Sequence, residues 1–64
     1  MNKDKKIFIA GSSGMVGSSI VRNLQRSGFE NLLTPSRKEL NLLDYNLVND
    51  FLKINKPDYI IMAA

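Results

Sequence analysis

The sequence has no cysteine, no histidine and no tryptophan among its 64 residues. Without cysteine and histidine the chain can form no disulfide bond, and the common metal sites and histidine-based catalytic triads are excluded. The absence of cysteine also fits a reducing compartment, so we expect a cytoplasmic protein. The remaining chemistry therefore has to come from glycine turns, hydroxyl groups and charged side chains.

Long apolar runs are missing as well. No stretch approaches the roughly 20 apolar residues that cross a bilayer. The charged segment at residues 1–6 leads into only four apolar residues, whereas a secretory signal needs about 7–15. We expect neither a membrane partner nor a secretion signal, and the hydrophobic content of 44% is that of a globular chain.

The charge balance is mildly basic, with nine lysine and arginine residues against six acidic ones and a net charge of +3. A nucleic-acid site would gather basic side chains on one face and expose aromatic rings beside them. The basic residues are not gathered in this way, and Phe8, Phe29 and Phe51 fit core positions. We interpret the charge as a solvated surface and expect no nucleic-acid partner.

The first half of the chain has the pattern of a strand followed by a helix. Ile7–Ala10 is a short apolar run, typical of a strand buried on both faces of a parallel sheet. Residues 15–27 repeat apolar positions at helical spacing, and Gly28 can close that helix in the left-handed conformation. The expected buried stripe consists of Val16, Ile20, Val21 and Leu24.

The second half of the chain has the pattern of a strand, a helix and a further strand. A strand is predicted at residues 31–34 before Pro35, followed by a loop or single turn over residues 36–43. A second helix is predicted over residues 45–54, and a third strand over residues 58–62 after Pro57. The expected buried face of the second helix consists of Leu47, Val48, Phe51 and Leu52.

Three glycines stand between the first strand and the first helix. Gly11, Gly14 and Gly17 have the spacing G-x-x-G-x-x-G. The first makes the tight turn, the second lets the backbone approach a dinucleotide pyrophosphate, and the third permits close helix packing. The helix start adds unpaired N–H groups and a positive dipole end. The turn residues expected to contribute backbone donors are Ser12, Ser13, Met15 and Val16. The alternative is a surface loop that contains three glycines.

The order of these elements defines the fold class. Strand, helix, strand, helix, strand is the first βαβαβ half of a Rossmann-type doubly wound parallel α/β sheet, here incomplete. Right-handed crossovers are expected to place both helices on one face and leave the other bare. A chain of 64 residues also buries only about 60% of its unfolded surface. We therefore expect residues 1–64 to be the N-terminal part of an NAD(P)-binding domain, unstable or self-associating in isolation.

The segment after the second strand decides between the two nicotinamide cofactors. It contains Ser36, Arg37 and Lys38, and no acidic residue between Leu32 and Lys38. An acid in this place would bind the ribose hydroxyl of NAD, whereas Arg37 can pair with the 2′-phosphate of NADP. We therefore predict NADP, with Ser36 and Lys38 assisting; the alternative is that these are ordinary loop charges.

Two further short segments are candidates for cofactor contact. Asn41 and Leu42 precede the second helix on the side expected for an adenine ring. Asp44 has two equally good roles, as a contact there or as a helix cap. Ala63 and Ala64 are small enough for backbone beside the ribose and pyrophosphate, although they could simply be packing residues.

Residues 11–20, 36–44 and 57–64 together resemble the N-terminus of the GDP-L-fucose synthase family. These are extended short-chain dehydrogenase/reductases, within the NAD-dependent epimerase/dehydratase group. The resemblance implies epimerisation of GDP-4-keto-6-deoxy-D-mannose at C3 and C5, followed by NADPH-dependent reduction of the 4-keto group. It also implies a nucleotide-sugar substrate and a homodimer at full length. By this resemblance the three glycines hold the pyrophosphate, Arg37 meets the 2′-phosphate, and Asn41 and Leu42 contact the adenosine end.

The chain departs from this family at Ser12 and Ser13, where the family usually has His-Arg. Loss of that Arg would remove a second 2′-phosphate contact and relax the cofactor preference, which leaves NAD possible. The family's catalytic Ser and Tyr-x-x-x-Lys motif lie downstream. Neither Tyr45 nor Tyr59 has a lysine four residues on, so we expect no catalytic residue within residues 1–64. Another nucleotide-sugar epimerase, dehydratase or reductase, or a non-catalytic NAD(P)-binding module, are the alternatives.

Overall fold

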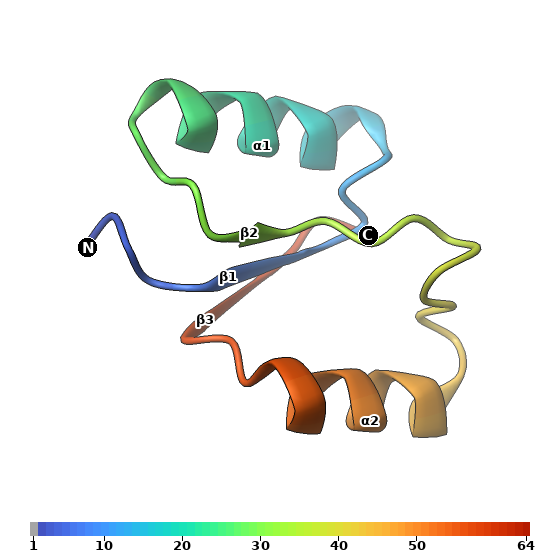
Figure 1. The fold of residues 1–64 in the computed structure, drawn as a ribbon. Coiled ribbons are helices and arrows are strands. Elements are labelled where there is room, and N and C mark those ends of the chain that lie inside the picture. Colours follow the sequence, from blue (N-terminus) through green and yellow to red (C-terminus); the bar gives the residue numbers. More distant parts are fainter. Residues whose placement is uncertain (1) are drawn as a thin grey trace.

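The computed structural model describes residues 2–64 and contains three strands and two helices. Each helix lies between two strands in the sequence, as the apolar patterns predict (Figure 1). The elements are β1 (Ile7–Ala10), α1 (Met15–Arg26), β2 (Leu32–Leu33), α2 (Tyr45–Asn55) and β3 (Tyr59–Met62). Neither helix is long and apolar enough to cross a membrane.

The strands form one parallel sheet in the order β2-β1-β3, with β1 in the centre. Ile7 pairs with Leu32 on one side and with Tyr59 on the other. All four residues of β1 are buried, which confirms the expected strand covered on both faces. β2 is only two residues long, shorter than the predicted 31–34, because only Leu32 and Leu33 pair with β1.

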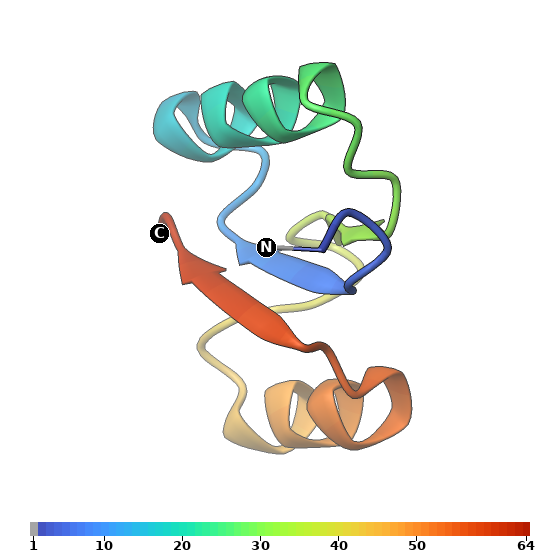
Figure 2. The same cartoon turned by 90° about the vertical axis from the view of Figure 1, so that its left-hand side faces the viewer.

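The expectation that both helices cover the same face is wrong. α1 and α2 lie on opposite faces of the sheet, which Figures 1 and 2 show from two directions. The first connection runs from β1 to β2, but the second passes back across β1 to reach β3. A right-handed crossover that travels in the reverse direction places its helix on the opposite face. The predicted bare face is therefore absent in residues 2–64, and only the argument from chain length still predicts marginal stability.

The alternation of β1 side chains supplies both helix interfaces. Phe8 and Ala10 belong to the cluster that packs against α2, where the Phe8 and Phe51 rings lie 4.8 Å apart between centroids. Ile7 and Ile9 point to the other face and are fully buried. One central strand thus anchors both layers.

Each helix ends in a left-handed residue. After α1, Gly28 has φ of 93°, its N–H donates to Gln25 O, and the Phe29 N–H donates to Leu24 O, which confirms the predicted glycine stop. After α2, Lys56 takes the same role at φ of 47°, directly before Pro57.

Both predicted apolar stripes are shorter than expected at their N-terminal ends. Val16 is 62% exposed and Leu47 is 48% exposed. Both lie in the first turn of their helices, at the carboxyl edge of the sheet, where the strands beneath have already ended. The remaining residues of the α2 stripe pack on the core as predicted. The first turns therefore contribute little to the core.

Candidate cofactor site

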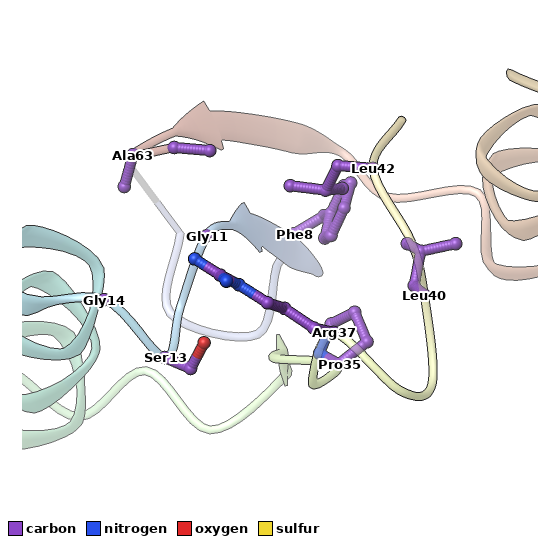
Figure 3. Close-up of a pocket in the computed structure, with 10 residues that line it drawn as sticks. Phe8, Gly11, Ser13, Gly14, Pro35, Arg37, Leu40, Leu42 and Ala63 are labelled. Atoms are coloured by element: carbon purple, nitrogen blue, oxygen red, sulfur yellow. The ribbon is translucent and has the colours of Figure 1, made fainter. Parts of the chain in front are cut away.

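A cleft of about 210 Å³ opens at the carboxyl edge of the sheet. It lies where β1 and β3 end side by side and the segment after β2 crosses in front of them (Figure 3). Ligands of open α/β sheets bind at this edge, where the chain reverses its direction across the sheet. The lining residues are Phe8, Gly11, Ser13, Gly14, Pro35, Arg37, Leu40, Leu42, Ala63 and Ala64.

Two of the three glycines are required by the protein's own packing. Gly11 has φ of 82°, and a Cβ there would lie 2.7 Å from the Ala64 backbone nitrogen. A Cβ at Gly17 would collide with the carbonyl group of Gly11 and lie 2.8 Å from the Ser12 Cα. The predicted roles of a tight turn and close helix packing are thus visible in the backbone itself.

Gly14 differs from these two. Its φ of −76° and ψ of 175° suit any residue, and a Cβ there would meet only Gly11 O, at an ordinary 3.5 Å. No contact within residues 2–64 therefore requires a glycine at this position. The space that a side chain would fill lies at the cleft, which is what the predicted approach of a pyrophosphate needs.

The start of α1 is prepared for an anion. Gly14 is the N-cap, no side chain of residues 2–64 caps the helix, and its first turn has no acidic residue. The N–H groups of the first turn at Met15, Val16 and Gly17 have no carbonyl four residues back within the helix. Together with the helix dipole, these donors favour a bound phosphate group.

Arg37 provides the positive charge of the cleft. Its side chain crosses the opening, and its guanidinium end points toward Gly11 (Figure 3). The guanidinium takes part in none of the side-chain hydrogen bonds within residues 2–64. It can therefore pair with a phosphate without first breaking a bond of the protein.

Not every predicted contact lies in this cleft. Seven predicted residues line it, whereas Ser12 lines a neighbouring hollow and Gly17 is buried beneath the turn. Met15 and Val16 expose their side chains, so that only their backbone can serve the site. The seven in the cleft are Gly11, Ser13, Gly14, Arg37, Leu42, Ala63 and Ala64.

The segment expected at the adenosine end has largely structural hydrogen bonds. Asn41 lines a groove beside the cleft, with its Oδ1 accepting a hydrogen bond of 3.0 Å from the Leu43 N–H. Asp44 accepts from the Leu47 N–H at 3.1 Å, which makes it the cap of α2. Of the two roles left open for Asp44, the structure shows the cap. The amide N–H groups of Asn41 take part in none of the side-chain hydrogen bonds within residues 2–64.

Three lining residues were not predicted as site residues, namely Phe8, Pro35 and Leu40. Phe8 and Leu40 are core residues whose edges reach the cleft, and Pro35 marks the end of β2. The alternation of β1 places Phe8 on the α2 face, but only the tertiary packing brings Leu40 beside it. Core residues of this kind carry no sequence signal of their own.

Ser36 and Glu39 close a small turn at the rim. The Ser36 N–H donates to the Glu39 carboxylate at 3.0 Å, and the Glu39 N–H donates to Ser36 Oγ at 3.2 Å. The Ser36 backbone and hydroxyl together lower the pKa of the Glu39 carboxyl below its usual 4.5. Ser36 thus has a structural partner at the place where it was expected to assist Arg37.

A parallel sheet with a glycine turn after its central strand, followed by an uncapped helix, defines a Rossmann-type α/β unit. Comparison with known sequences makes the assignment more specific. The chain belongs to the NAD dependent epimerase/dehydratase family, whose sequence profile matches residues 7–64. This membership covers the glycine turn and every lining residue of the cleft.

Individual relatives are similar along the whole chain. GDP-L-fucose synthase 1 of Arabidopsis thaliana is 48% identical over 98% of the chain, and the GDP-L-fucose synthase of Escherichia coli is 45% identical over 94%. The solved GDP-mannoheptose C4 reductase from Campylobacter jejuni, with NADP bound, is 42% identical over the full chain with a TM-score of 0.96. The chain spans about a fifth of the length of each of these proteins.

Proposed function

We propose that residues 1–64 hold the pyrophosphate and adenosine end of NADP in an enzyme that reduces a GDP-linked sugar. The observation that carries this proposal is the open space at Gly14, next to an uncapped helix and a free guanidinium. An arrangement of this kind fits a phosphate group. The fit to an NADP-bound reductase over the full chain supports the choice of cofactor.

Different residues of the cleft bind different parts of the cofactor. The turn from Gly11 to Gly14 and the first turn of α1 receive the pyrophosphate, and Arg37, in the same cleft, supplies the cation for the 2′-phosphate. Leu42, which is 37% exposed, lines the cleft (Figure 3) and can cover one face of a base. When bound, NADPH supplies the hydride for reduction of a carbonyl group. Binding, rather than proton transfer, is the contribution of this part of the chain.

The more specific proposal is that the enzyme converts GDP-4-keto-6-deoxy-D-mannose to GDP-L-fucose. Relatives named GDP-L-fucose synthase at 45–48% identity support it. The second candidate is the C4 reduction of another GDP-sugar, favoured by the likeness to the heptose reductase. Both reactions require NADPH, so the cleft serves either one.

The test uses the protein at its natural length and measures NADPH binding by the fluorescence of the reduced nicotinamide. We expect saturable binding, and oxidation of NADPH when GDP-4-keto-6-deoxy-D-mannose is added. Binding without turnover of this sugar, but with turnover of a GDP-4-keto-heptose, would favour the second candidate. Binding without turnover of any keto-sugar would indicate a non-catalytic module, and no binding would overturn the proposal.

A further inference from the structure

The segment that carries Arg37 is a single helical turn over residues 36–40, closed by three hydrogen bonds. The Ser36 N–H donates to Glu39 Oε1 at 3.0 Å, and the Glu39 N–H donates back to Ser36 Oγ at 3.2 Å. The Leu40 N–H donates to the Ser36 carbonyl oxygen at 2.9 Å. The reciprocal pair of side-chain bonds is the capping box of a helix start, here closed around one turn.

Both ends of this turn are held by other means than the capping box. Pro35 precedes it with a fixed φ, and Leu40, which is 4% exposed, belongs to the core. Residues 37–39 between them are exposed. The bonds between Ser36 and Glu39 are the only side-chain hydrogen bonds of residues 34–40 within the described part of the chain. The conformation of the exposed part of the turn therefore depends on this pair.

Arg37 and Glu39 belong to the same turn but line different cavities. Arg37 lines the cleft, where its side chain crosses the opening (Figure 3). Glu39 lines a separate hollow of about 280 Å³ beside β2 and Phe51, and it is absent from the lining of the cleft. Its hydrogen bonds go to Ser36 and not to the Arg37 guanidinium. Apart from its charge, Glu39 can thus affect a ligand in the cleft only through the backbone of the turn.

We propose that Glu39 is a positioning residue, whose hydrogen bond from the Ser36 N–H sets the turn so that Arg37 stands at the cleft before the cofactor binds. The inference rests on the proposed function, since it concerns the same cleft. An arginine in an open loop would lose conformational freedom when it binds a phosphate group, and this loss weakens affinity. A turn that is already closed reduces the loss, because the backbone at Arg37 is fixed in advance.

The charge of Glu39 and its hydrogen bond act on a bound anion in opposite directions. The carboxylate repels a phosphate group, whereas its bond to Ser36 favours the same group through the placement of Arg37. Glu39→Gln separates the two effects, because the amide oxygen can accept the same bond without the charge. Glu39→Ala removes both.

The experiment measures dissociation constants for NADPH and NADH by nicotinamide fluorescence in the protein at its natural length. The variants are Glu39→Ala, Glu39→Gln, Arg37→Gln and the double variant Glu39→Ala/Arg37→Gln. Glu30→Ala is the matched control, because Glu30 is an exposed acid before β2 and lines neither the cleft nor the hollow. Urea denaturation checks that each variant is folded.

We expect Glu39→Ala to raise the dissociation constant for NADPH about fivefold. The constant for NADH should stay within about twofold, since NADH has no 2′-phosphate for Arg37 to bind. Glu39→Gln and Glu30→Ala should stay within about twofold of the unmodified protein for both cofactors. The double variant should bind NADPH no more weakly than Arg37→Gln alone, because Glu39 then has no guanidinium to position.

Additive losses in the double variant, an equal effect of Glu39→Ala on both cofactors, or no effect on either would overturn the inference, while NADPH binding by the unmodified protein upholds the proposed function. A loss in Glu39→Gln as large as that in Glu39→Ala would overturn it too, because the hydrogen bond would then not be the cause. Failure of the unmodified protein to bind NADPH would overturn both.

Discussion

The N-termini of the two helices lie at the same edge of the sheet, yet they are built in opposite ways. α2 begins at Asp44, whose carboxylate accepts from the Leu47 N–H at 3.1 Å. α1 begins at Gly14, which has no side chain and leaves the first-turn N–H groups without a cap. The two helices have similar lengths, of 12 and 11 residues, so the difference lies in the caps.

This difference separates stability from binding. The cap of Asp44 stabilises its helix by about 1 kcal/mol and neutralises the partial charge that an anion would need. At α1 the missing cap lowers the stability of the helix and keeps the same donors open to a ligand. The absence of a side-chain cap at the start of α1 is therefore explained by the cleft in front of it, where a ligand can use the free N–H groups.

The largest expected effect on stability is that of Gly17→Ala, which adds a methyl group where α1 packs closely against the glycine turn. Gly17→Ala places a Cβ against the Gly11 carbonyl and the Ser12 Cα, and backbone atoms cannot move aside cheaply. We expect a loss of about 3 kcal/mol in the free energy of unfolding, measured by urea denaturation. A loss below about 0.5 kcal/mol would show that the helix can shift without cost, and would remove the packing role of this glycine.

The next largest effect is expected when α1 receives the same cap as α2. Gly14→Asp fits the local backbone, because φ of −76° and ψ of 175° are ordinary for an N-cap residue. We expect a gain of a few tenths of a kcal/mol in stability and a loss of NADPH affinity of 10-fold or more, since the carboxylate occupies and repels the phosphate site. Fluorescence titration and urea denaturation of one preparation measure both quantities.

Gly14→Ala tests whether the volume of a side chain at this position weakens NADPH binding without the negative charge that Gly14→Asp introduces. The structure tolerates its Cβ at 3.5 Å from Gly11 O, so stability should stay within about 0.5 kcal/mol. Affinity for NADPH should still fall, by less than in Gly14→Asp. Unchanged affinity in both variants would contradict the place assigned to the pyrophosphate.

Removal of the cap from α2 is the reverse change. Asp44→Ala removes the bond to the Leu47 N–H, and we expect a loss of about 1 kcal/mol in the free energy of unfolding. Affinity for NADPH should remain within about twofold, because Asp44 does not line the cleft. Asp44→Asn keeps an acceptor at this position and should restore most of the stability. A selective loss of NADPH affinity would instead support the cofactor contact that the sequence also permitted.

The smallest effect concerns Glu39 at the rim of the cleft. Hydrogen bonds from Ser36 lower its pKa below 4.5, so its folded-state pKa lies below the unfolded value. Its contribution to stability is therefore complete above the unfolded pKa and is lost as the pH falls through the folded pKa. The stability difference between the natural protein and Glu39→Gln should narrow from about pH 6 to about pH 3. A difference that stays constant over this range would contradict the lowered pKa.

The local parts of the fold follow closely from the residue pattern. The bounds of β1 are those predicted, and those of both helices agree to within one residue, because hydrophobic period, glycine and proline act over a few residues. The extent of β2 was less predictable, since a two-residue strand depends on its pairing with Ile7 and Phe8. The exposed first-turn residues Val16 and Leu47 were also missed, because periodicity does not show where the sheet beneath a helix ends.

The candidate site likewise contains some residues that the sequence predicted and others that it did not. The glycine turn and Arg37 were predicted from residue type and spacing, and the structure places them in one cleft. Leu40 was not predicted as a site residue, since no spacing relates it to Phe8 or to the glycine turn. Only the tertiary packing brings it beside Phe8 at the cleft.

The first strand, the glycine turn and the helix that follows it could all be predicted from the residues alone, because backbone conformation and the room for a Cβ are local properties. The helix ends at Gly28 and before Pro57 were predictable for the same reason. Only the folded chain shows that β3 lies beside β1 and that the two helices cover opposite faces of the sheet. Strand order is chosen by pairing between distant segments, and that choice of neighbour leaves no periodic trace in either segment.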